Sequence, residues 1–85
     1  MEITAYTLVG CSNCKTLREL FKRAETDYTE IMVKRDMTIE DFHASYPHVT
    51  SFPFVVIDGN EVGDLVAAVK LFVAKGLVSS SKKSG

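Results

Sequence analysis

The spacing of hydrophobic and polar residues along this chain predicts strands that alternate with amphipathic helices. Residues 3–8 (Ile-Thr-Ala-Tyr-Thr-Leu) are rich in strand-forming types and predict a first strand. The next apolar positions recur three and four residues apart, as on one face of a helix, and are Cys14, Leu17, Leu20, Phe21 and Ala24. Charged residues occupy the other face, namely Lys15, Arg18, Glu19, Lys22 and Arg23. This pattern predicts a helix of about 12 residues that begins at the cysteines.

The middle of the chain predicts a second strand and a second helix. The strand covers residues 28–33, which include several residues that favour extended structure. Thr38 has the side chain of a helix N-cap, and Asp41 lies at the third helical position behind it. This helix should end by Tyr46, because Pro47 disfavours helical geometry in the residue before it.

The last third of the chain predicts a hairpin and a final helix. Residues 54–57 (Phe-Val-Val-Ile) form a short apolar strand, and residues 58–60 (Asp-Gly-Asn) are typical of a hairpin turn. A return strand begins at residues 61–62. Asp64 is placed to cap the helix that follows, and Gly76 to end it.

Together these elements predict one α/β domain over residues 1–76, in the order β-α-β-α-β-β-α. The first two strands should be parallel, because a helical crossover joins them, and the last two should be antiparallel. The expected result is a four-stranded mixed sheet flanked by helices. Residues 77–85 end in Ser-Ser-Ser-Lys-Lys-Ser-Gly and are expected to form a polar, disordered C-terminal tail.

Composition narrows the class of protein. The chain has 85 residues, is 46% hydrophobic and 25% charged, and carries a formal net charge of -1, which argues against nucleic acid as its main partner. Its first residues lack the basic-then-apolar layout of a signal peptide, and no apolar stretch approaches the roughly 20 residues that span a bilayer. We therefore expect a cytoplasmic location and no membrane partner.

The chain's two cysteines, Cys11 and Cys14, fall at the first strand-to-helix junction. A lone structural disulfide is not expected in a reducing cytosol. The unpaired N–H groups and the positive dipole end of a helix start favour a thiolate at Cys11. Cys14 lies three residues on, within reach of a disulfide, and shares the apolar stripe with Leu17 and Phe21. This asymmetry predicts Cys11 as the nucleophile and Cys14 as the resolving cysteine.

The two cysteines also fit two other roles. Both can serve as small core residues, which is common for a single cysteine and uncommon for a pair at this junction. With His43 and His48 they make a nominal Cys₂His₂ set for zinc. A predicted helix and strand separate the cysteines from the histidines, so no metal site is predicted.

Three motifs occur in a specific order and spacing: Tyr6-Thr7-x-x-x-Cys11-x-x-Cys14, Tyr46-Pro47-x-Val49-x-x-x-Pro53 and Val55-Val56-Ile57-Asp58-Gly59. In these motifs, and over residues 3–75, the chain resembles the glutaredoxins of the thioredoxin superfamily, in particular the short glutaredoxins of tailed phages. The resemblance implies a thioredoxin-like fold and a dithiol enzyme. Such an enzyme reduces protein disulfides or glutathione mixed disulfides, uses glutathione as co-substrate and binds no cofactor.

The resemblance also implies a substrate site. Pro53 would be a cis-proline packed against the cysteine pair, and the backbone of Phe52 would pair with an extended substrate. Gly63 and Asp64 would hold the γ-glutamyl end of glutathione through backbone N–H groups and an acidic side chain. From the residues alone, Asp64 is simply a helix N-cap, and the two roles are compatible.

The chain departs from the family pattern at several positions. Ser12-Asn13 replaces the usual Pro-Tyr between the cysteines, and Leu8-Val9-Gly10 lacks the lysine that often pairs with the glycine carboxylate of glutathione. Two aromatic residues stand where a β-branched residue and a glutamine are usual, namely Phe52 and Phe54. Lys34 or Arg35 is a candidate for the missing cation, although both fit a solvated turn.

The resemblance leaves three functional hypotheses. The first is a monomeric glutaredoxin that donates electrons to disulfide-containing proteins such as ribonucleotide reductase, in the host cytoplasm if the protein is viral. The second is a thioredoxin-like donor recycled by a flavoprotein reductase. The third is a carrier of a two-iron cluster held by two chains and two glutathiones, with which Ser12 is compatible.

Overall fold

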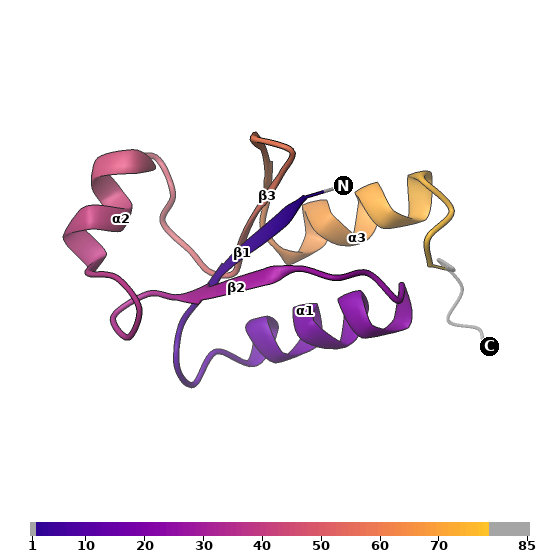
Figure 1. Cartoon of the computed structure of the whole chain (residues 1–85), viewed down its shortest axis with the longest axis horizontal. Helices are drawn as coiled ribbons and strands as arrows, with labels where there is room; N and C mark the ends of the chain where they lie inside the picture. The colour runs from indigo at the N-terminus through magenta and orange to yellow at the C-terminus, as the bar shows by residue number, and fades with distance from the viewer. Residues whose placement is uncertain (1, 79–85) are drawn as a thin grey trace.

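Seven helices and strands follow one another along residues 2–78, the part of the chain that the computed structural model describes (Figure 1). They are β1 (Ile3–Thr7), α1 (Ser12–Arg23), β2 (Thr29–Met32), α2 (Ile39–Ser45), β3 (Phe54–Ile57), β4 (Asn60–Gly63) and α3 (Leu65–Ala74). The predicted order is confirmed, and β1 and β2 are slightly shorter than the sequence pattern suggested. The disordered tail proposed for the C-terminus falls mainly on residues 79–85, which lie outside the described part.

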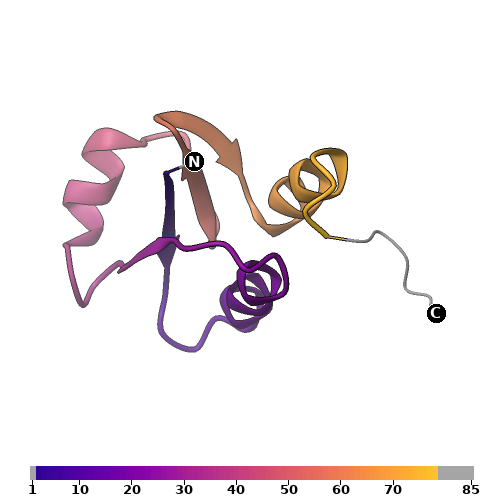
Figure 2. The same ribbon diagram turned by 45° about the vertical axis from the view of Figure 1, so that its right-hand side comes forward.

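The four strands form one mixed sheet in the order β2-β1-β3-β4. β1 is parallel to β2 and antiparallel to β3, and β3 is antiparallel to β4. The predicted parallel crossover and the predicted hairpin are therefore both present. Figure 2 shows α2 on one side of this sheet and α1 with α3 on the other. The fold is the predicted thioredoxin-like α/β arrangement.

Each face of the sheet carries its own hydrophobic core. Beneath α1 and α3 the buried side chains are Ile3, Ala5, Leu17, Phe21, Val55, Ile57, Ala68 and Phe72. Beneath α2 they are Val33, Phe42, Val49, Phe54 and Val56. Because side chains of a strand alternate between the two faces, the four consecutive apolar residues of β3 supply both cores. This explains why β3 is apolar throughout rather than alternating.

The helix starts follow the predicted capping. The hydroxyl of Thr38 accepts a hydrogen bond from the N–H of Asp41 at 3.0 Å, and α2 ends before Tyr46 as expected. The N-cap of α1 is Cys11 itself. Among residues 2–78, the helices are all too short or too polar to cross a bilayer.

Candidate active site

Strand pairing brings three separate segments to one end of the sheet. Tyr6 pairs with Phe54 across antiparallel strands, so the end of β1 lies beside the start of β3. Val55 pairs with Gly63, which places the end of β4 at the same edge. The cysteine loop after β1, the segment before β3 and the turn after β4 therefore converge. The fold thus gathers residues that the sequence separates by about 50 positions.

Cys11 lies at the centre of this convergence. Its Sγ atom accepts a hydrogen bond from the backbone N–H of Cys14 at 3.2 Å. The same sulfur lies 3.8 Å from the carbonyl oxygen of Phe52, toward which the thiol can donate. Gly10 has a φ of 77°, a left-handed conformation that favours glycine, and it turns the chain from β1 into α1. The sulfur is thus fixed at the N-terminus of α1 and is only half-buried.

Cys14 lies in a different environment. Its side chain is completely buried on the inner face of α1, and both cysteines are free thiols. Burial, and then a hydrogen bond with Cys11, raises the pKa of Cys14 to about 12. The backbone N–H of Leu8 and the positive charge of Arg18 act in the opposite direction on this pKa. Cys14 therefore stays protonated while both cysteines are free thiols.

The residues predicted for the substrate site lie next to one another. The Phe52–Pro53 peptide bond is cis, as the resemblance implied, and the Pro53 side chain is buried. Pro53, Gly63 and Asp64 line one cavity of about 330 Å³, which also includes His48. The Asp64 carboxylate accepts the N–H of Ala67 at 3.1 Å and so caps α3, while its side chain remains exposed.

Gly63 lies at the turn between β4 and α3, where the backbone conformation and the space available both favour glycine. Its φ of 124° is rarely adopted by other residues, and a Cβ atom there would lie 3.1 Å from Cβ of Ala67. Glycine therefore allows β4 to pass close to the first turn of α3. The close approach places the first turn of α3 in the wall of the cavity, which Ala67 also lines.

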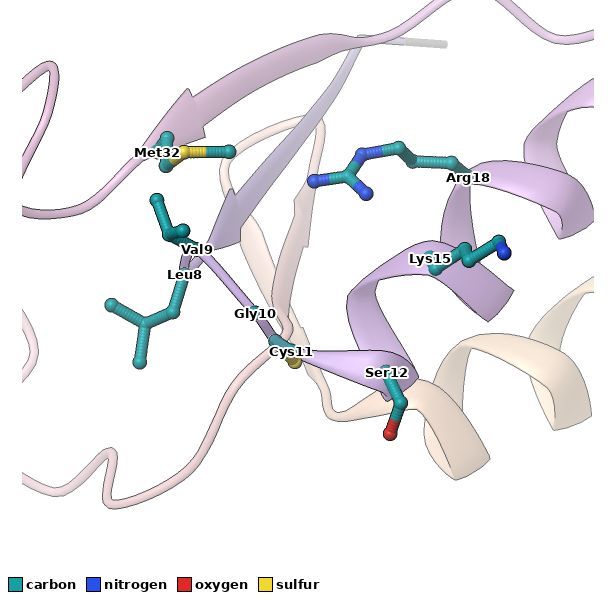
Figure 3. Close-up of a pocket in the computed structure, with 8 residues that line it drawn as sticks. All are labelled: Leu8, Val9, Gly10, Cys11, Ser12, Lys15, Arg18 and Met32. Atoms are coloured by element: carbon teal, nitrogen blue, oxygen red, sulfur yellow. The ribbon is translucent and has the colours of Figure 1, made fainter.

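A second cavity, of about 420 Å³, has Cys11 in its wall (Figure 3). Its wall contains apolar side chains from the loop after β1 and from Met32, together with Lys15 and Arg18 of α1. The sequence pattern assigned both cations to the solvent-facing side of the helix. The structure places Arg18 differently, since it forms a two-point ion pair with Glu30 in which Arg18 is 35% exposed and Glu30 21%.

The two cations proposed to replace the missing lysine do not line the cavity that contains Cys11. Lys34 and Arg35 line a distinct cavity of about 640 Å³ near the start of α2. Arg35 is paired with Asp36 at 3.0 Å. Both residues belong to the turn between β2 and α2, and a role for either in a glutathione site stays a prediction.

The zinc interpretation has no geometric basis in the described chain. In residues 2–78, no cluster of three or more His, Cys, Asp or Glu side chains is arranged to hold a metal ion. Cys11, Cys14, His43 and His48 therefore do not form a Cys₂His₂ site. His48 instead pairs with Glu61 of β4 at the rim of the cavity that contains Pro53.

A thioredoxin-like fold with a Cys-x-x-Cys pair at the first strand-to-helix junction defines the class of thiol–disulfide oxidoreductases. The sequence model of one family in this class, described as Glutaredoxin, matches residues 3–62. The chain therefore belongs to the glutaredoxin family. Comparison with curated proteins finds no match.

Solved structures agree with this fold. Glutaredoxin 1 from Francisella tularensis, solved with cacodylate, has a TM-score of 0.74 at 18% identity, covering 89% of this chain and 95% of that one. The buckwheat glutaredoxin–glutathione complex has a TM-score of 0.76 at 17% identity, with 88% and 71% covered. The thioredoxin-like protein BC3987 has a TM-score of 0.66 at 28% identity, with 89% and 99% covered.

Proposed function

We propose that this glutaredoxin is a dithiol enzyme in which Cys11 attacks disulfides and Cys14 resolves the product. The Cys11 thiolate attacks one sulfur of a substrate disulfide, and the other substrate sulfur leaves as a thiolate that takes up a proton. Cys14 then loses its proton and attacks Cys11, releasing the second substrate thiol. The substrate gains two electrons, and the protein keeps a Cys11–Cys14 disulfide. The observation that carries this proposal is the unequal placement of the two thiols on α1.

Glutathione is the proposed reductant that returns the disulfide to the dithiol. Support comes from the cavity formed by Pro53, Gly63 and Asp64, which combines a helix N-terminus with an exposed carboxylate. The γ-glutamyl end of glutathione carries a carboxylate and an ammonium group, which match these two features. The carbonyl of Phe52, close to the Cys11 sulfur, is the proposed backbone partner for an extended substrate. One of the similar structures is a glutaredoxin in complex with glutathione.

The proposed substrates are protein disulfides and glutathione mixed disulfides, with ribonucleotide reductase as one candidate acceptor of the electrons. The half-buried Cys11 sulfur, adjoining an open cavity, suits a disulfide presented on a protein surface.

A thioredoxin-like donor is the second candidate function. It is favoured by residues 8–10, which lack a cation for the glycine carboxylate of glutathione, and by the position of Lys34 and Arg35 in another cavity. The similarity to the thioredoxin-like protein BC3987 also favours this candidate. In this case a flavoprotein reductase, rather than glutathione, would reduce the Cys11–Cys14 disulfide.

A paired turnover assay separates the two candidates. One arm supplies glutathione with glutathione reductase, the other supplies thioredoxin reductase, and NADPH consumption is followed with the same mixed-disulfide substrate. Turnover mainly in the glutathione arm supports the proposal, and turnover mainly in the other arm supports the alternative. Cys11→Ser is the control and should be inactive in both arms. Turnover in neither arm by the wild-type protein would overturn both functions.

A further inference from the structure

A hydrogen-bonded network of three side chains lies beside the cysteine helix. Arg18 of α1 donates two hydrogen bonds to Glu30 of β2, from Nε to Oε1 at 2.9 Å and from Nη2 to Oε2 at 2.7 Å. The hydroxyl of Thr7, at the end of β1, donates to Oε2 of Glu30 at 2.7 Å. Thr7 is only 1% exposed. Three different elements therefore fix the position of the Arg18 guanidinium.

The network directs the Arg18 charge toward the cysteine end of the fold. Arg18 follows Cys14 by four residues, so the two side chains lie on neighbouring positions of one helix face. Figure 3 shows the guanidinium extending across the cavity toward Val9 and Met32, whereas Lys15 is directed the other way. Arg18 also lines the cavity that adjoins Cys11.

Cys14 is the group that needs such a charge. To resolve a mixed disulfide, its buried thiol must become a thiolate, which burial disfavours. While Cys11 carries the substrate, it no longer acts as a thiolate beside Cys14. Of the groups in residues 2–78 that act on the Cys14 thiolate, the Leu8 N–H and the Arg18 charge then remain as favourable ones.

We propose that Arg18, held in place by Glu30 and Thr7, stabilises the Cys14 thiolate during resolution and so sets the rate of that step. This inference rests on the proposed dithiol function. In the step, the Cys14 proton passes to water or a buffer base. The new thiolate attacks Cys11, the bond between Cys11 and the substrate sulfur breaks, and the substrate leaves as a thiolate. Arg18 is a positioning residue that acts through its charge and takes no part in bond formation.

Neighbouring charges limit how strongly Arg18 can stabilise the Cys14 thiolate. Glu30 on β2 offsets part of the positive field, and Tyr28 and Arg35 also act on this pair. Because the cation is paired and partly exposed, we expect its removal to slow resolution by about threefold to tenfold near neutral pH. The pH at which resolution reaches half its maximal rate should rise by about half a unit to one unit.

Stopped-flow mixing with a symmetric aromatic disulfide that releases a coloured thiolate tests this inference. The first release reports attack by Cys11, and the second reports resolution by Cys14, so the two steps are measured separately. Arg18→Gln should leave the first phase nearly unchanged and slow the second. The pH at which the second phase reaches half its maximal rate should be higher than in the wild type. Arg18→Lys should recover part of the rate. Arg23→Gln, which removes an exposed arginine in the last turn of the same helix, should change neither phase.

Glu30→Gln distinguishes a charge effect from simple support of the helix. The amide oxygen of the glutamine can still accept a hydrogen bond from Arg18, so Glu30→Gln keeps the guanidinium in place and removes only the opposing charge. If Arg18 acts through its charge, the second phase should then be as fast as in the wild type, or faster. If the network only braces α1, Glu30→Gln and Arg18→Gln should slow it alike, which would overturn the inference. It would also be overturned if Arg18→Gln resolves at the wild-type rate and pH profile. Failure of the wild type to release a second equivalent would instead count against the proposed dithiol function.

Discussion

The backbone N–H of Cys14 donates a hydrogen bond to the Sγ atom of Cys11 across 3.2 Å. A cysteine therefore occupies the N-cap position of α1, where Ser, Thr, Asp or Asn is usual. The bond joins a half-buried sulfur at the helix start to a residue whose own sulfur is fully buried. The first turn of one helix thus gives two thiols three residues apart unequal exposure.

Alkylation should show this inequality directly. In the reduced protein near pH 7, iodoacetamide should label Cys11 and leave Cys14 largely unmodified, because burial both encloses Cys14 and raises its pKa to about 12. Peptide mapping by mass spectrometry gives the labelled fraction of each residue. Both cysteines should react in denaturant, which serves as the control. Equal labelling of the two in the folded protein would contradict the assigned roles.

The ion pair between Arg18 and Glu30 should make the free energy of unfolding depend on pH. The hydrogen bonds from Arg18, and then from Thr7, hold the pKa of Glu30 below its usual value. A lowered carboxylate pKa adds stability above the unfolded value, about 4.3, and that stability is lost as pH falls through the folded value. Glu30→Gln should therefore lower the free energy of unfolding near pH 7. Because the pair is partly exposed and solvent screens it, the expected loss is only about 1 kcal/mol.

Urea unfolding near pH 7 and near pH 3 measures this difference. The gap between Glu30→Gln and the wild type should shrink at the lower pH, because the carboxyl of the unfolded chain is protonated there and part of the contribution of the charge to stability is lost. Glu19→Gln, which changes an exposed carboxylate on α1, should differ little from the wild type at either pH. A gap for Glu30→Gln that stays the same at both pH values would show that its charge does not contribute.

Asp64 should affect the glutathione reaction more than the fold when its cap is preserved. Asparagine caps helices about as well as aspartate, so Asp64→Asn keeps the bond to the N–H of Ala67 and removes the charge. We expect the KM for glutathione to rise by roughly fivefold with a smaller change in kcat, because one exposed charge-assisted contact of about 1 kcal/mol is lost at a distance from the reacting sulfur.

Two comparisons isolate the role of Asp64 in binding. Thr38→Ala removes an equivalent cap from α2 and should lower stability by about 1 kcal/mol without changing the KM for glutathione. Direct reduction of a small disulfide by prereduced Asp64→Asn should stay at the wild-type rate. If the KM is unchanged in Asp64→Asn, Asp64 is only a helix cap.

The main features of the fold could be predicted because local signals and packing agree. Residues 54–57 are apolar without interruption, and the sheet indeed buries both faces of β3. Thr38, Asp41 and Pro47 mark the limits of α2, and the structure places both ends there. The cysteine pair was recognisable because its spacing and its position before a helix carry chemical meaning independent of tertiary contacts.

The Arg18 network could not be predicted in the same way. The helical pattern gives the direction of Arg18 around α1 but not the element opposite it. Glu30 faces Arg18 only because β2 is placed beside β1, with Ala5 paired to Glu30 across the parallel register. Lys34 and Arg35 line a different cavity for a related reason, since the turn between β2 and α2 carries them there. Long-range pairing therefore determines which charges reach the site.

Trapping of the mixed disulfide tests the central claim, that Cys11 attacks and Cys14 resolves. Each reduced protein is mixed with glutathione disulfide, quenched in acid and analysed by intact mass. Cys14→Ser should accumulate one glutathione on Cys11, while the wild type should form its internal disulfide with little adduct. Cys11→Ser should remain unmodified and inactive. An adduct on Cys14 in Cys11→Ser, with turnover retained, would contradict the account.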